Sequence, residues 1–183
     1  MTENESRILW ARHNYKNLVK AAQSFDPDND LQMLTFFYVF SEFYYRDYLK
    51  GSDILMFPSF MTEMQSWIEL LLFHAFEAKV IDFNEKYNND VTIYPQSRID
   101  GTPYIVDFEV IGNSEAKLLI ECDGHDYHST KEQIACDHKR QREIENLGYT
   151  FLRFSGSEIY NDPEGCVEEI YKKLQFLDKK GGL

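Results

Sequence analysis

The hydrophobic pattern of this chain changes its period once, at the polar run Asn88-Asn89-Asp90, and that change limits the folds open to it. Before the run, apolar residues recur every three or four positions, as on one face of a helix. After it, apolar and polar residues alternate, which is typical of β-strands. The pattern predicts helices over 6–25 and 62–79, with an aromatic helix after Asp30 between them, and strands over 91–94, 104–111, 117–123 and 149–154.

Two more helices are expected among and after these strands. Overlapping capping boxes begin at Ser129 and Thr130 and predict a helix that stops at Gly148, a residue suited to a left-handed cap. Pro163 suits the first turn of a closing helix over 163–177. The order is therefore helices followed by β-β-β-α-β-α, and the fold class predicted is an α/β sandwich with an N-terminal helical layer.

Composition excludes several classes of protein. The chain has 183 residues, enough for one ordinary domain, and a net charge of −12, which excludes binding of nucleic acid by bulk positive charge. No apolar run is long enough to span a membrane, and we expect no membrane partner. Three cysteines cannot all pair within one chain, so we expect a cytoplasmic protein with reduced thiols.

Chemistry is concentrated in the hairpin predicted from the strands 104–111 and 117–123. If residues 112–116 form its loop, paired residue numbers sum to 228, and Asp107 lies opposite Glu121. Opposed carboxylates on an apolar hairpin repel each other and lose solvation unless a cation or a shared proton compensates. Hard oxygen ligands at this spacing suit Mg²⁺ or Mn²⁺. The alternative is a solvent-facing pair of carboxylates with no function.

Residues 91–158 resemble the PD-(D/E)XK, or restriction-endonuclease-like, nuclease superfamily, and are most similar to the branch of the very-short-patch-repair endonucleases. The motifs that carry the resemblance follow one another in the order and at the spacing of that branch. They are Pro95-Gln96, Tyr104-Ile-Val-Asp107-Phe, Ile120-Glu121-x-Asp123-Gly-x-x-x-His128, Asp137-x-x-Arg140, and Leu147-Gly-Tyr-x-x-Leu-Arg153-Phe-x-x-x-Glu158-Ile.

The resemblance implies a restriction-endonuclease-like core with a mixed central sheet flanked by helices, and a divalent-metal-dependent endonuclease acting on DNA. It implies that Asp107 and Glu121 ligate Mg²⁺, with Mn²⁺ as a substitute, and that the carbonyl of Cys122 is a third ligand. Glu69 matches the helical glutamate that often completes such sites. Hydrolysis would then proceed by in-line attack of a metal-activated water on the phosphodiester.

The chain departs from the superfamily pattern at one position, because Asp123 stands where a lysine usually follows the second acid. That lysine would orient the attacking water or stabilise the pentavalent phosphorus, so the general base is left open. We count Asp123 among the candidate catalytic residues and take His128 as the candidate base, since imidazole titrates near neutrality. The alternative for His128 is a polar neighbour of a helix cap.

Four of the five candidate contacts to nucleic acid lie on or beside the helix that begins near Ser129, and the fifth, Gln96, belongs to the Pro95-Gln96 motif. The matching motifs and the basic residues of this helix point to flanking phosphates as their targets. For Arg140 the alternative is an ordinary ion pair with Asp137, three positions earlier. The candidate residues are Gln96, Lys131, Lys139, Arg140 and Arg142.

The chain is divided here into an aromatic-rich helical extension over 1–60, packed on the core, and a nuclease-like domain over 61–183. The aromatic residues near Phe36 and Phe43 are spaced as a buried helix face, although they could also dock a partner protein or a second copy of the chain.

Two other functions are open at this point. Cys122-x-x-His125-x-x-His128, with Cys136 and His138 nearby, could hold structural zinc, although alternation turns Cys122 away from Glu121. A catalytically inactive module that binds nucleic acid or protein would also explain Asp123 and the negative charge. Metal binding separates an inactive module from an enzyme.

Overall fold

The computed structural model describes residues 64–113, 117–124 and 131–181, together with scattered positions between 16 and 29. The described elements alternate in the order expected from the hydrophobic pattern, with one additional short helix. They are α4 (Trp67–Tyr87), β1 (Thr92–Arg98), β2 (Ile105–Ile111), β3 (Leu118–Asp123), α5 (Lys131–Glu145), β4 (Thr150–Ser155), α6 (Gly156–Asn161) and α7 (Pro163–Gly181).

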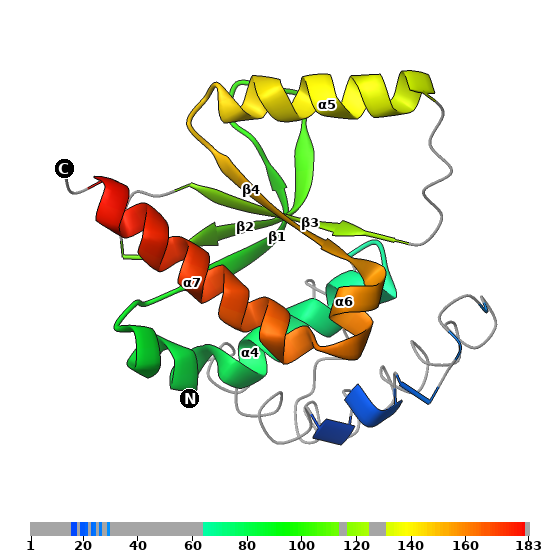
Figure 1. Cartoon of the computed structure of the whole chain (residues 1–183), viewed down its shortest axis with the longest axis vertical. Helices are drawn as coiled ribbons and strands as arrows, with labels where there is room; N and C mark the ends of the chain where they lie inside the picture. Colours follow the sequence, from blue (N-terminus) through cyan, green and yellow to red (C-terminus); the bar gives the residue numbers. More distant parts are fainter. Residues whose placement is uncertain are drawn as a thin grey trace, which may run out of the picture.

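The four strands form one sheet in the order β1-β2-β3-β4. The pairs β1–β2 and β2–β3 are antiparallel, whereas β4 joins β3 in parallel after the crossover through α5. Helix α5 lies on one face of the sheet, and α4, α6 and α7 lie on the other (Figure 1). A mixed sheet flanked by helices on both faces confirms the predicted α/β class.

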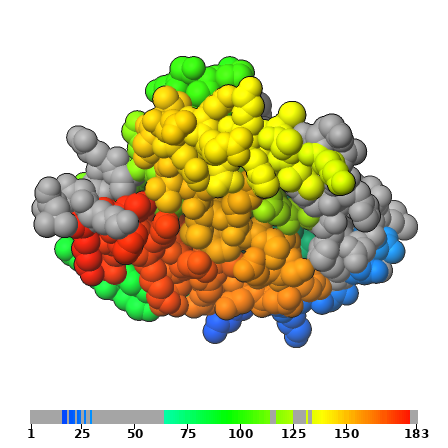
Figure 2. Space-filling model, turned by 45° about the horizontal axis from the view of Figure 1, so that its top comes forward, coloured from blue at the N-terminus to red at the C-terminus, as the bar shows by residue number. Residues whose placement is uncertain are grey.

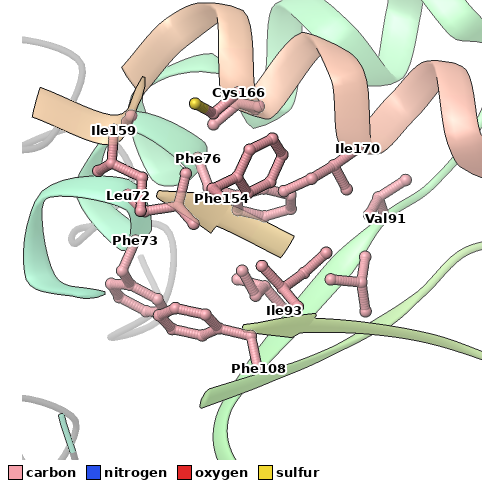
Figure 3. Close-up of a cluster of buried hydrophobic side chains, with 14 of the residues drawn as sticks. Leu72, Phe73, Phe76, Val91, Ile93, Phe108, Phe154, Ile159, Cys166 and Ile170 are labelled. Atoms are coloured by element: carbon pink, nitrogen blue, oxygen red, sulfur yellow. The ribbon is translucent and has the colours of Figure 1, made fainter. Parts of the chain in front are cut away.

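A large core lies between the sheet and the layer formed by α4, α6 and α7. Phe73 of α4 and Phe108 of β2 stack with ring centroids 6.2 Å apart, and both side chains are at most 1% exposed. Figure 3 shows these rings beside Leu72, Phe154 and other apolar side chains of the same core. A smaller core on the opposite face joins Ile144 of α5 to the sheet.

Both ends of helix α4 have identifiable caps. The Ser66 side chain accepts a hydrogen bond from the Glu69 N–H, and Asn88 ends the helix at a left-handed φ of 49°. The prediction of a helix over 62–79 was therefore wrong at both ends, because the helix begins only at Trp67 and ends about two turns beyond Lys79. The buried apolar stripe continues past Lys79 through Val80 and Phe83, three positions apart, and extends the helix to Tyr87.

Other boundaries follow from capping and turn chemistry. Gly148 has the predicted left-handed conformation, with φ of 90°, after α5. Helix α6 was not predicted; it begins directly after β4 because Ser155 and Glu158 form a reciprocal capping box. The capping boxes predicted at Ser129 and Thr130 lie outside the described residues, as does the aromatic segment after Asp30.

Two contacts connect the described N-terminal positions to the rest of the fold. Val19 and Ala21 pack against the large core, and the Gln23 side chain donates to the carbonyl of Tyr160 at 3.3 Å. Among the described helices, none combines the length and the apolar character that crossing a bilayer requires. In the space-filling view, α5 (yellow) lies above α6 and α7 (orange to red) on the face shown (Figure 2).

Candidate active site

Asp107 lies at a break in the hydrogen-bonded ladder of the sheet. The predicted register, in which paired residue numbers sum to 228, is confirmed where β2 and β3 pair. The last pair of that ladder is Phe108 with Ile120, so the pairing ends next to Asp107 and does not include it. On the other side, β1 pairs on both sides of Gln96 but not at Gln96, which has a left-handed φ of 48°. The Asp107 carboxylate instead accepts a hydrogen bond from the Cys122 N–H at 2.7 Å. The main chain of β3 therefore holds this carboxylate, and the predicted pairing of Asp107 with Glu121 is replaced by this contact.

The surroundings of Asp107 disfavour its negative charge. Burial raises the pKa of its carboxyl to about 7, against the hydrogen bond from Cys122, and the charges of Glu121 and Glu69 raise it further. Arg140 has the opposite, smaller effect. The carboxyl is thus divided between its neutral and charged forms near pH 7, and a nearby cation would favour the charged form.

Glu121 is a second buried carboxylate, on the adjacent strand β3. It is 9% exposed, and burial raises its pKa although the Arg140 guanidinium opposes the shift. Arg140 Nη2 donates to Glu121 Oε1 and also to the carbonyl of Ile105 at 3.0 Å. The expected alternative for Arg140, an ion pair with Asp137, is present as a longer contact of 3.5 Å. The principal partner of Arg140 is therefore the candidate metal ligand itself.

Asp123 orients Arg153, which the sequence placed in a family motif but to which it assigned no role. Arg153 of β4 donates to both oxygens of Asp123, from Nε at 3.0 Å and from Nη2 at 2.7 Å. Its third nitrogen, Nη1, lies 3.3 Å from Asp137. In the parallel register Arg153 is the partner of Glu121, so a fixed positive charge stands beside the candidate ligand. The signal in the sequence was an arginine in the middle of a predicted apolar strand.

Glu69 lies at the start of α4 with both carboxylate oxygens bonded to neighbouring groups. Oε1 accepts from the Ser66 hydroxyl at 2.6 Å, and Oε2 accepts from the Gln65 N–H and the Gln96 amide, each at 2.9 Å. Its charge still acts on Asp107. Gln96, a candidate contact to nucleic acid, also accepts a hydrogen bond from the Gln65 amide at 3.0 Å. The structure therefore shows Glu69 and Gln96 in a polar cluster next to Asp107, and their predicted roles stay predictions.

The family model REase_MTES_1575, which describes a restriction-endonuclease-like family, matches residues 76–174. The chain belongs to this restriction-endonuclease-like family. The match spans Asp107, Glu121, Asp123, Arg140 and Arg153, and it confirms the predicted superfamily and fold. The nearer resemblance to very-short-patch-repair endonucleases stays a prediction.

One curated relative is similar to part of the chain. An uncharacterized protein of Haemophilus influenzae is 39% identical over 72 residues, which are 39% of this chain and 56% of that protein. The chain thus aligns with little more than half of the relative's length.

The donor set of this restriction-endonuclease-like protein fits a divalent cation at two carboxylates. Asp107 and Glu121 supply hard oxygen ligands from adjacent strands. Burial is the main cause of the raised pKa of Asp107, and the negative charges of Glu121 and Glu69, which a cation would offset, raise it further. Among the described residues no group of three His, Cys, Asp or Glu side chains is placed to hold a metal ion. A complete site would therefore need main-chain or water oxygens, or a change in the partners of Glu121.

The remaining candidates divide between exposed and undescribed positions. Lys131, Lys139 and Arg142 are exposed on α5, and Lys139 lies 3.7 Å from Glu143. His128 lies outside the described residues. The basic residues are thus available to a ligand approaching α5, in contrast to Arg140, which is turned toward the sheet.

The zinc alternative gains no support from the described cysteines. Cys122 packs against the large core, as alternation predicted, whereas Cys136 is exposed on α5. Burial, together with the neighbouring carboxylates, raises the pKa of the Cys122 thiol well above its usual value, which disfavours the thiolate that zinc requires. All three cysteines are free.

Proposed function

We propose that this protein is a divalent-metal-dependent endonuclease that hydrolyses phosphodiester bonds in DNA. The observation that carries the proposal is the pair of buried carboxylates, Asp107 and Glu121, on adjacent strands of a family domain of restriction-endonuclease-like proteins. A fold with no use for this pair would have little reason to bury both, because each loses solvation there.

Mg²⁺ is the proposed cofactor, with Mn²⁺ as a substitute. Asp107 and Glu121 would hold it, with the Cys122 carbonyl as the third ligand that the resemblance implies. When bound, such a cation polarises the scissile phosphate and lowers the pKa of the attacking water. The hydrogen bond from the Cys122 N–H holds the Asp107 carboxylate in place for this role.

The other polar residues around the pair take supporting roles in this proposal. Arg153, held by Asp123, supplies the positive charge beside Glu121 that the absent superfamily lysine would give. His128 stays the candidate general base. Glu69 acts on the site through its charge, and its hydrogen bond to Gln96 maintains the left-handed turn in β1. Asp123 is thus a positioning residue.

Binding of nucleic acid follows from the nuclease family, and the proposed substrate within that class is DNA. Lys131, Lys139 and Arg142 on the exposed side of α5 are the proposed phosphate contacts. Because the whole chain is strongly acidic, its grip on DNA is expected to be local and to depend on the cation. A partner protein or a second copy, docked through the aromatic N-terminal segment, would extend that grip. With three free cysteines, the cytoplasm is the proposed location.

The test is cleavage of supercoiled plasmid and of single-stranded DNA in Mg²⁺, Mn²⁺ or EDTA. Asp107→Asn retains an acceptor for the Cys122 N–H but removes the charge, and Glu121→Gln does the same on β3. The matched control is Glu109→Gln, since Glu109 lies on the same strand and hydrogen-bonds Ser97 at 2.6 Å. We expect cation-dependent cleavage by the wild type and the control, and none by the two site variants.

Retained cleavage in both site variants would overturn the assignment of the site. Absence of cleavage by the wild type, together with no effect of Mn²⁺ on its melting temperature, would favour the inactive binding module instead. If the wild type does not cleave DNA, but Mn²⁺ raises its melting temperature and not that of Asp107→Asn, the metal site is supported and DNA alone is not its substrate.

A further inference from the structure

Arg140 is the cation that pairs with Glu121 in this structure. Its Nη2 nitrogen bonds both to Glu121 Oε1 and to the carbonyl of Ile105 at the start of β2, two residues before Asp107. The side chain of Arg140 is 25% exposed and that of Glu121 is 11% exposed. The guanidinium therefore neutralises a largely buried carboxylate of the candidate site.

The two arginines of the site are held very differently. Arg153 makes a two-point contact with Asp123 and a further one with Asp137, which fixes its plane. Arg140 has a single nitrogen shared between Glu121 and a carbonyl, a longer contact to Asp137 at 3.5 Å, and the ring of Tyr104 at 5.9 Å. Arg140 is thus the guanidinium that can leave Glu121 without losing every partner.

The charges at the site indicate that Arg140 would leave Glu121 when a divalent cation binds. A divalent cation bound by Asp107 and Glu121 would stand close to the guanidinium that bonds Glu121 Oε1, and it would repel that guanidinium. It would also give this buried carboxylate the compensating charge that Arg140 supplies in this structure. Binding of the cation therefore favours release of Arg140 from Glu121.

We propose that Arg140 is an exchangeable counter-ion: it neutralises Glu121 in the metal-free protein, is displaced when a divalent cation binds Asp107 and Glu121, and then contacts a phosphate of the substrate. This inference rests on the proposed function and assigns to the site a coupling between metal and nucleic acid. The displaced guanidinium stays on α5, the helix that also exposes Lys131, Lys139 and Arg142. Metal binding thereby adds one positive group to the surface that meets the phosphodiester chain.

The first measurement is the affinity for Mn²⁺ by isothermal titration calorimetry, with no nucleic acid present. Arg140→Gln removes the competitor, so we expect Mn²⁺ to bind about 10-fold more tightly than to the wild type, within the usual range of coupling between two sites. Lys179→Gln removes the same charge from an exposed position of α7, on the other face of the sheet, and should leave the affinity unchanged. A circular dichroism spectrum verifies that each variant is folded.

The second measurement separates exchange from simple repulsion by a fixed charge. Binding of a fluorescein-labelled DNA duplex is compared in EDTA and in Ca²⁺, a hard cation with the same preference for oxygen, and a gel shows that the duplex stays intact. We expect Ca²⁺ to increase the duplex affinity of the wild type and to increase that of Arg140→Gln several-fold less, because linkage is reciprocal.

Each outcome bears on a different statement. If the wild type binds no Mn²⁺, the proposed function and this inference both fail. If the wild type binds Mn²⁺ but Arg140→Gln binds it no more tightly, the inference alone is overturned. The inference is also overturned if Arg140→Gln binds Mn²⁺ more tightly but Ca²⁺ increases its duplex affinity as much as that of the wild type. That result would show Arg140 to be a fixed charge that only repels the metal.

Discussion

Replacing Asp107 by asparagine should stabilise the metal-free protein, and the gain should grow with pH. The carboxyl is buried at the break between β2 and β3, and its pKa rises from 3.8 to about 7. Asparagine has nearly the same shape and keeps an acceptor for the Cys122 N–H, which now donates to Asp107 at 2.7 Å. The substitution therefore removes the cost of a buried charge and little else.

The sign and size follow from proton linkage. Because the native pKa is the higher one, the folded protein binds more protons than the unfolded chain between pH 3.8 and 7, so wild-type stability falls as the pH rises through this window. The slope is about 1.4 kcal/mol per pH unit where the difference is a full proton. Between pH 5 and pH 8 the wild type should lose about 2.5 kcal/mol relative to Asp107→Asn, with nearly all of the loss complete by pH 7.5.

The assay is urea unfolding of both proteins in EDTA at pH 5, 6, 7 and 8, with the free energy of unfolding obtained by linear extrapolation. Asp100→Asn, at an exposed carboxylate of the turn between β1 and β2, removes the same charge without the burial and is the control. A difference between wild type and Asp107→Asn that does not change with pH would refute the reasoning. So would an equal pH-dependent gain in the control.

Three further predictions concern the fold. Phe108→Ala should lower the free energy of unfolding by about 3–5 kcal/mol in urea, because the Phe108 ring is fully buried against Phe73; a loss below about 1 kcal/mol would contradict that packing. Ser66→Ala removes the acceptor for the Glu69 N–H and should cost about 1 kcal/mol by thermal unfolding, whereas Ser66→Thr keeps the hydroxyl and should retain most of the stability. Gly148→Ala forces a side chain onto a φ of 90° and should cost about 1 kcal/mol or more, and an unchanged melting temperature would speak against the left-handed cap.

The hairpin of β2 and β3 could be predicted because its determinants are local. Alternating polarity identified both strands, and a symmetric loop over 112–116 was enough to set the register, which Phe108 and Ile120 confirm. The same locality explains the left-handed Gly148 and the start of α7 at Pro163. The end of α4 was predicted wrongly, because polar residues become frequent after Lys79 although the helix continues to Tyr87.

The environment of Asp107 could not be read from the hairpin alone. A regular ladder would have continued past Phe108, but Gln96 on β1 adopts a left-handed conformation and bonds to Glu69 on α4. This arrangement involves three elements that are far apart in the sequence. At the same place the carboxylate of Asp107 accepts a hydrogen bond from the main chain of β3, where a regular ladder would pair Asp107 with Glu121.

By itself, the sequence determined the class of fold, the hairpin and the pair of acids on it, because repeating polarity and turn residues act over a few positions. Only the tertiary structure decided which arginine side chains pair with the acids of the site. Arg140 reaches Glu121 across 19 positions, and Arg153 reaches Asp123 across 30. Both contacts depend on how α5 crosses the sheet and on how β4 joins β3 in parallel. Ion-pair partners in a folded protein are chosen by such packing, since Coulomb attraction acts between groups that the chain has already brought together.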